Sequence, residues 1–173
     1  MNKKKIIALV VLWLVLFAVI YVRPLPLEDI MPGIFDAPIT ACEAKFCTVE
    51  AGEDGKPVYK DVTKRFAPDS DECSELLRLL QDGKYRLQLA SAFYGGHRPP
   101  EKQPCPRAEI RFTQGDVVYE VCAYTKYFVM GPVGALRDVD PAEEEAATFA
   151  VMEFVRDHGE VVSVDIRDYA NQG

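Results

Sequence analysis

The hydrophobic pattern opens with an unbroken apolar run from Ile6 to Val22, preceded by lysines at positions 3–5. Its seventeen residues would rise about 25 Å as a helix, at the short end of what crosses a bilayer core. Arg23 and Pro24 end the run. Because lysine and arginine accumulate on the cytoplasmic side, the pattern predicts a single-pass anchor over 6–22, with the N-terminus inside and the remaining chain outside the cell.

Two other leader types fit parts of this pattern. A cleaved signal peptide usually has an apolar region of about 7–15 residues and a small-residue cleavage site. This run is longer and ends in Ile20-Tyr21-Val22, with no small pair to cut. Ile39-Thr40-Ala41-Cys42 resembles the lipobox of bacterial lipoproteins, but it lies about twenty residues beyond the apolar run. An uncleaved signal anchor over residues 1–23 is therefore the prediction.

Residues 24–38 contain four prolines, which favour extended backbone and predict a linker that holds the following domain away from the membrane. The segment also carries apolar residues that can pack on the domain or on a partner: Leu25, Leu27, Ile30, Met31, Ile34 and Phe35. The domain itself is predicted to span residues 39–173.

The first of two predicted domain helices follows Asp69, which has capping-box spacing to Glu72. Its apolar residues recur at i, i+3, i+4 and i+7 and form one buried stripe: Cys73, Leu76, Leu77 and Leu80. Gly83 is predicted to end this helix.

The second predicted helix starts at Asp140, a natural N-cap, with Pro141 at its first position and Glu143 completing an Asp-x-x-Glu box. Gly159 is expected just past its end. The residues predicted to face the core are Ala147, Val151 and Phe154.

Alternating apolar and polar residues predict antiparallel strands: Lys45–Ala51, Val58–Thr63, Tyr85–Leu89, Tyr127–Met130 and Val161–Ile166. The clearest hairpin joins 108–112 to 117–121 through Gln114-Gly115, with Glu109, Arg111 and Glu120 on the wet face. This order predicts an α+β domain with an antiparallel sheet of about five or six strands and two helices packed on one face.

Charge narrows the classes of partner. The chain has 27 acidic and 20 basic residues. Four of the basic residues belong to the leader, so the predicted outer part has 16 against 27, a net charge of −11. Phosphate backbones would repel such a domain, and nucleic acid is excluded as its expected partner.

The loop of thirteen residues at 94–106 is long for a compact domain, and such loops are often functional. Tyr94, His97 and Arg98 supply an aromatic ring and two donors and are the predicted binding residues. The same loop holds the candidate for catalysis, Cys105 as nucleophile with His97 as base, but nothing aligns a third orienting group. The sequence has no zinc-ligand spacing and no nucleotide or hydrolase motif, so no metal and no cofactor are predicted.

Five cysteines leave one thiol unpaired if disulfides form outside the cytoplasm. Cys105 and Cys122 lie across the predicted hairpin on one face and are a possible disulfide, provided that the turn is longer than two residues. Cys42 and Cys47 are five apart and would lie on opposite faces of one strand. Cys73 is predicted to be a buried small hydrophobe.

The layout resembles small uncharacterised extracytoplasmic domains of Gram-positive bacteria, carried as lipoproteins or behind one membrane anchor. The likeness spans roughly residues 39–158 and lies in Val62-Thr63, the Leu76-Leu77-Leu79-Leu80 helix, Tyr85-Arg86 and the two hairpin strands. The resemblance implies no known activity and no functional residues.

The predicted function is that of a membrane-anchored extracytoplasmic binding or accessory module, whose partner is a protein or an envelope component. The alternative is an extracytoplasmic thiol-based enzyme centred on Cys105 and His97.

Overall fold

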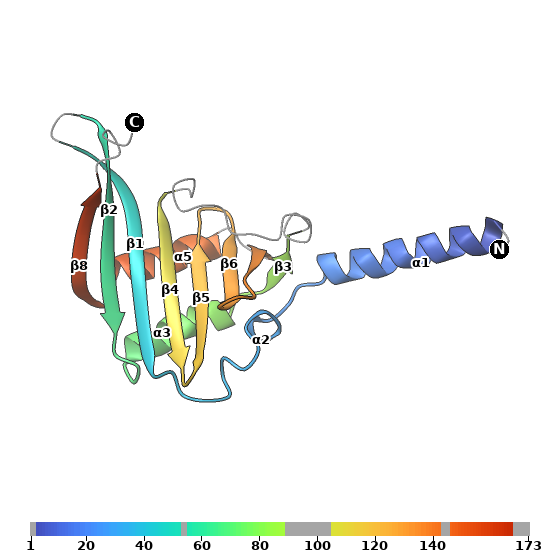
Figure 1. Ribbon diagram of the computed structural model, residues 1–173, viewed down its shortest axis with the longest axis horizontal. Helices are drawn as coiled ribbons and strands as arrows, with labels where there is room; N and C mark the ends of the chain where they lie inside the picture. Colours follow the sequence, from blue (N-terminus) through green and yellow to red (C-terminus); the bar gives the residue numbers. More distant parts are fainter. Residues whose placement is uncertain (1–2, 53–54, 89–104, 143–145, 168–173) are drawn as a thin grey trace.

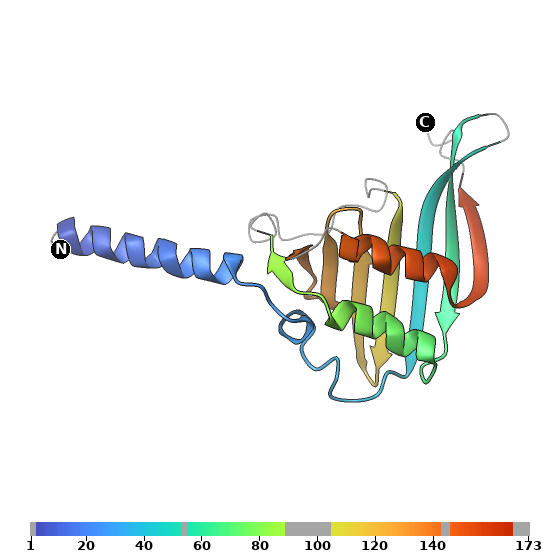
Figure 2. The same ribbon diagram turned by 180° about the vertical axis from the view of Figure 1, so that it is seen from behind.

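The part of the chain that the structure describes forms one eight-stranded antiparallel sheet with two helices, α3 (Asp71–Gln81) and α5 (Ala146–Asp157), across one of its faces (Figures 1 and 2). The computed structural model describes residues 3–52, 55–88, 105–142 and 146–167, with the backbone alone at 18 and 20–22. The predicted α+β class is confirmed, but the prediction of five or six strands was too low.

The strands, in chain order, are β1 (Ala41–Ala51), β2 (Pro57–Phe66), β3 (Tyr85–Leu87), β4 (Arg107–Gln114), β5 (Val117–Ala123), β6 (Phe128–Pro132), β7 (Arg137–Pro141) and β8 (Glu160–Arg167). In space they run β3-β7-β6-β5-β4-β1-β2-β8. Strand β8 is therefore one edge of the sheet, and β3 is the other.

The strands alternate between a face covered by the helices and an open face. On the covered side, Cys42 of β1 lies opposite Phe66 of β2 and Phe112 of β4, and all three are buried. The predicted hairpin is confirmed, with Phe112 opposite Tyr119 and Ile110 opposite Val121. Their burial against the helices leaves the intervening residues of the same strands on the open face.

Helix α3 begins one residue later than predicted, because its N-cap is Ser70 and not Asp69. The Ser70 hydroxyl accepts a hydrogen bond of 3.1 Å from the Cys73 amide, which satisfies one of the free N–H groups of the first turn. Cys73, Leu76 and Leu80 are buried, which confirms the apolar stripe.

The predicted start of the last helix was wrong. Asp140 and Pro141 belong to β7, where they pair with Arg86 and Tyr85 of β3, so their backbone is part of the sheet ladder. Strand β7 was not predicted, because Asp-Pro is a good helix start. Proline is also tolerated at the end of a strand near the edge of a sheet, which is where Pro141 lies. From residue 146 onward α5 packs as an amphipathic helix.

Helix α5 buries Thr148, Val151, Met152 and Val155, while Phe154 is half-buried and stacks on Phe66 with ring centroids 6.3 Å apart. Its C-terminal end is confirmed at Gly159, whose φ of 83° suits glycine. The Lys64 ammonium donates to the carbonyl oxygens of Arg156 and of His158, the latter at 2.7 Å. These bonds satisfy C-terminal carbonyls that the helix leaves free.

The proline-rich segment 24–38 packs on the domain and does not extend as a spacer. It contains the short helix α2 (Leu27–Ile30). Four of its apolar side chains are at most 1% exposed: Leu27, Ile30, Met31 and Ile34. Its carbonyl groups are held as well, since the Tyr119 hydroxyl donates to Pro32 at 2.8 Å and the Gln114 amide donates to Ile34 at 3.1 Å. The folded unit therefore begins near Leu25 and not at residue 39.

Helix α1 (Lys3–Val22) projects from the β3 edge, away from the layers of the domain (Figure 1). Its large apolar side chains from Ile6 to Leu16 are exposed, with Trp13 at 67%. Among the described residues, no helix reaches the length and apolarity that a bilayer crossing requires.

Candidate functional site

The open face of the sheet carries charged residues on three adjacent strands, β1, β4 and β5. The register places Glu43, Arg111 and Glu120 in one row across the sheet. Lys45, Glu109 and Cys122 form the next row. Each of these side chains points away from the core because its strand neighbours point into it. The predicted wet face of Glu109, Arg111 and Glu120 is thus confirmed.

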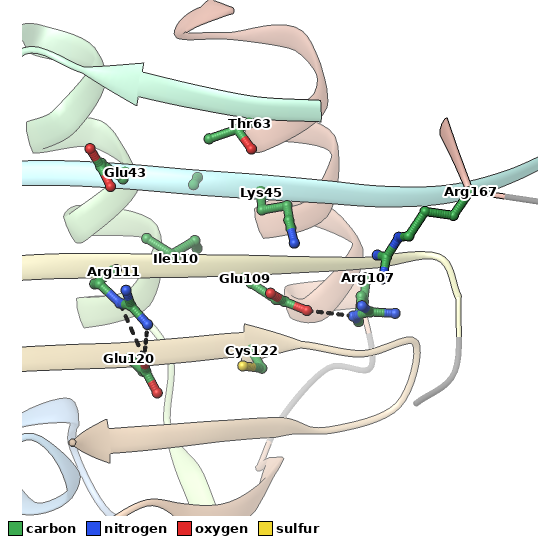
Figure 3. Close-up of a pocket in the computed structure, with 11 residues that line it drawn as sticks. Glu43, Lys45, Thr63, Arg107, Glu109, Ile110, Arg111, Glu120, Cys122 and Arg167 are labelled. Atoms are coloured by element: carbon green, nitrogen blue, oxygen red, sulfur yellow. Dashed lines mark hydrogen bonds and ion pairs between the residues drawn. The ribbon is translucent and has the colours of Figure 1, made fainter. Parts of the chain in front are cut away.

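Two arginines of β4 form close ion pairs on this face (Figure 3). The Arg111 guanidinium donates to the Glu120 carboxylate at 2.5 Å across the strand pair. Arg107 donates through Nε to Glu109 on its own strand at 2.6 Å. The Arg111 side chain is 59% exposed, so its pair is worth well under about 1 kcal/mol. Arg107 is only 7% exposed and is therefore fixed in place.

A third ionic group joins β1, β2 and β8. Asp61 of β2 is 2% exposed, and its carboxylate lies 3.6 Å from the Lys45 ammonium. The Arg167 guanidinium donates to the same carboxylate. A buried carboxylate needs such partners, since leaving it unpaired costs several kilocalories per mole. The two cations therefore cover Asp61 and remain at the surface.

The open face of the sheet is hollowed by a pocket of about 420 Å³ (Figure 3). It is lined by Glu43, Ala44, Lys45, Thr63, Arg107, Glu109, Ile110, Arg111, Glu120, Cys122 and Arg167. Four lining residues are basic and three are acidic. The mixed charges suit a polar ligand that carries both signs, and they do not form the one-sided basic surface that binds nucleic acid.

The cysteines near this face are poor nucleophiles. Burial raises the pKa of Cys47 to about 11 and of Cys122 to about 12. Burial also raises the pKa of Cys105, although the Arg107 guanidinium, 3.3 Å from its sulfur, opposes the shift. Because the thiolate is the reactive form, a raised pKa lowers the reactive fraction of each of these thiols at neutral pH. The alternative of a thiol-based enzyme finds no support from these residues.

The proposed bond between Cys105 and Cys122 is not formed in the structure, where both thiols are free. The hairpin turn has two residues, Gly115 and Asp116, and the resulting register sets Cys122 opposite Glu109. Cys105 precedes β4 and has no partner position on β5 within that ladder.

The other predicted site residues, Tyr94, His97 and Arg98, lie outside the described residues, as does most of the 94–106 loop. Within the described ranges, no group of three or more His, Cys, Asp or Glu side chains could hold a metal ion. His158 stacks on Phe154 with ring centroids 4.2 Å apart, at the end of α5.

Sequence reasoning missed five polar members of the hollow: Glu43, Lys45, Thr63, Arg107 and Arg167. Strand alternation could have placed Lys45 on the open face, but no local pattern reveals that β1 lies between β2 and β4. Arg167 reaches the site because β8 pairs with β2 across about one hundred residues of chain.

Comparison of the chain with protein-family models, with curated proteins and with solved structures finds no match. The resemblance to small extracytoplasmic domains therefore stays a prediction, and the function has to be argued from the site itself.

Proposed function

We propose that this protein is a single-pass membrane-anchored extracytoplasmic module that binds a polar segment of a protein or envelope component on the open face of its sheet. The observation that carries the proposal is the hollow of about 420 Å³ with charged side chains of both signs in its lining. The helices leave the open face of the sheet uncovered, because they pack on its opposite face (Figure 2).

The membrane part of the proposal is supported by the exposed apolar surface of α1. Its large side chains from Ile6 to Leu16 are 42–67% exposed. A continuous apolar surface of this extent is unfavourable in water and calls for a lipid or protein environment. The lysines at 3–5 precede the run, so the positive-inside rule favours an outer domain.

The junction between helix and domain is short. Leu25 exchanges two backbone hydrogen bonds with Tyr85 of β3, at 2.7 and 3.0 Å, only two residues after Arg23. The β3 edge therefore faces the anchor. Strands β4 and β1 lie four to five steps of about 4.8 Å from that edge, so the hollow would stand roughly 20 Å above the membrane. That height favours a protein or envelope partner over a lipid headgroup.

The chemistry of the hollow suggests how a partner would bind. A carboxylate of the ligand can exchange for Glu120 at the exposed Arg111, and a cationic group can bind Glu43, which is 52% exposed. Arg107 lines the hollow, is buried and is held by Glu109, so it serves as a fixed cation in the lining. On binding, exposed ion pairs within the protein would be replaced by ion pairs with the ligand, while the buried charge keeps its position.

The test is site-specific photo-crosslinking with the full-length chain in its native membrane. A photoreactive phenylalanine analogue replaces Thr63, which lines the hollow. The matched control carries the analogue at Ser74, an exposed residue of α3 on the other side of the sheet. We expect a discrete adduct from position 63 only.

Three results would count against the proposal. Equal adducts from positions 63 and 74, or none from position 63, would mean that the open face has no partner. A reporter fused after Gly173 should be active outside the membrane, and activity in the cytoplasm would contradict the location.

A further inference from the structure

Two buried cysteines from different elements meet between the sheet and α3. Cys42 lies on β1 and is 1% exposed, and Cys73 lies in the first turn of α3 and is 2% exposed. Both belong to the same core cluster, and each thiol shifts the pKa of the other. Cys42 pairs with Phe66 at the end of β2, and α3 begins five residues after Phe66 on the covered face. The two thiols are therefore neighbours across the interface between sheet and helix.

We propose that Cys42 and Cys73 form a disulfide that ties α3 to β1 when the chain folds in the presence of a disulfide oxidant. Each thiol gives up one proton and one electron, both S–H bonds break, and one S–S bond forms. The oxidant, a small-molecule or protein disulfide, takes up both electrons and both protons and leaves as two thiols. Such oxidants act outside the cytoplasm, so formation in the cell rests on the proposed location of the domain.

The arrangement selects this pair over the other cysteines. Cys47 is five residues beyond Cys42 on the same strand, so its side chain lies on the opposite face of the sheet. Cys122 lines the hollow on the open face, and Cys105 contacts Arg107 there. The sheet thus separates these three thiols from α3, whereas a disulfide needs Cα atoms within about 7 Å. Only Cys42 is within reach of Cys73 among the five.

The bond would close a loop that contains the whole β1–β2 hairpin and the turn into α3. Restricting a loop of this size in the unfolded chain is the main way in which a disulfide stabilises a fold. Because both sulfurs are buried in the folded state, the bond would form during folding and then resist reduction.

Peptide mapping tests the pairing without any mutation. The full-length chain, purified in detergent, is refolded with oxidised glutathione, alkylated with iodoacetamide and cleaved with trypsin. A lysine or arginine separates each cysteine from the next, so each of the five falls in its own peptide. We expect the peptides of Cys42 and Cys73 to be joined, with a mass two hydrogen atoms below their sum.

Recovery of Cys42 and Cys73 only as separate alkylated peptides would overturn the proposal. So would a bond from Cys42 to Cys47. As variants, Cys73→Ala should abolish the joined species, whereas the matched control Cys47→Ala should retain it. Reduction should lower the melting temperature by roughly 5–12 °C in the wild type and in Cys47→Ala, and should leave that of Cys73→Ala unchanged.

The same mapping on protein alkylated in intact cells separates the two proposals. A joined species in cells supports both the pairing and the outer location. A joined species after refolding, but not in cells, supports the pairing and counts against the location of the domain.

Discussion

Leu27→Ala tests whether the segment between the apolar helix and the first strand belongs to the core. Leu27 is fully buried in α2, and truncating a buried leucine costs about 2–5 kcal/mol. The Pro32 carbonyl is bonded to Tyr119 and the Ile34 carbonyl to Gln114, so the backbone cannot easily close the cavity. We therefore expect a loss of about 3 kcal/mol, in the middle of that range.

The assay is urea unfolding followed by circular dichroism, with a chain that starts at Pro24. For a slope of about 2 kcal/mol per molar urea, the midpoint should fall by about 1.5 M. Phe35→Ala is the matched control, because Phe35 lies in the same segment and is 38% exposed. It should shift the midpoint by less than about 0.5 M.

If Leu27→Ala lowers the urea midpoint by less than about 0.5 M, residues 24–38 do not contribute to the core and act as a linker. A chain that starts at Ile39 offers an independent check. It lacks Leu27, Ile30, Met31 and Ile34, so it should lose cooperative unfolding.

Three further predictions use the same unfolding assay. Ser70→Ala should cost about 1 kcal/mol through loss of the N-cap. Gly159→Ala should cost about 1–3 kcal/mol, because φ is +83° and a Cβ would lie 2.8 Å from the Phe66 ring. Burial raises the pKa of Cys47 to about 11 and of Cys122 to about 12 from a usual 9.0. The free energy of unfolding should therefore be constant below pH 9 and should fall as the pH rises towards 11 to 12. The fall should be smaller in Cys47→Ala and in Cys122→Ala.

Most of the helices and strands follow from local patterns in the sequence. The stripe of Cys73, Leu76 and Leu80 predicts α3 because its period matches the helix. The alternation of apolar and polar residues on either side of Gly115 predicts the β4–β5 hairpin because its period of two matches a strand. Such signals depend on neighbours within a few residues, and so they can be read without knowledge of the fold.

Other features depend on contacts that are distant in sequence. Four prolines predict an extended linker, yet burial of Leu27 and Met31 against the domain outweighs that local preference. Asp140 and Pro141 have the composition of a helix start, but pairing with β3 makes them part of a strand. The Cys42–Cys73 contact was missed because it requires the relative placement of β1 and α3.

The candidate site was predicted in part. Alternation correctly placed Glu109, Arg111 and Glu120 on the open face. The buried Asp61 and its partner Arg167 come together only through the pairing of β2 with β8. A hollow formed by five strands depends on their spatial order, which no single stretch of the sequence encodes.

The most direct test of the binding function is the yield of the crosslink from position 63 in two charge-reversal variants. Arg111→Glu removes an exposed cation from the hollow, while Arg86→Glu makes the same change on β3, three strands away from β5. The account predicts that Arg111→Glu lowers the yield at least several-fold at an unchanged melting temperature, and that Arg86→Glu leaves the yield unaltered. Equal yields from both variants would contradict the claim that the open face binds a partner.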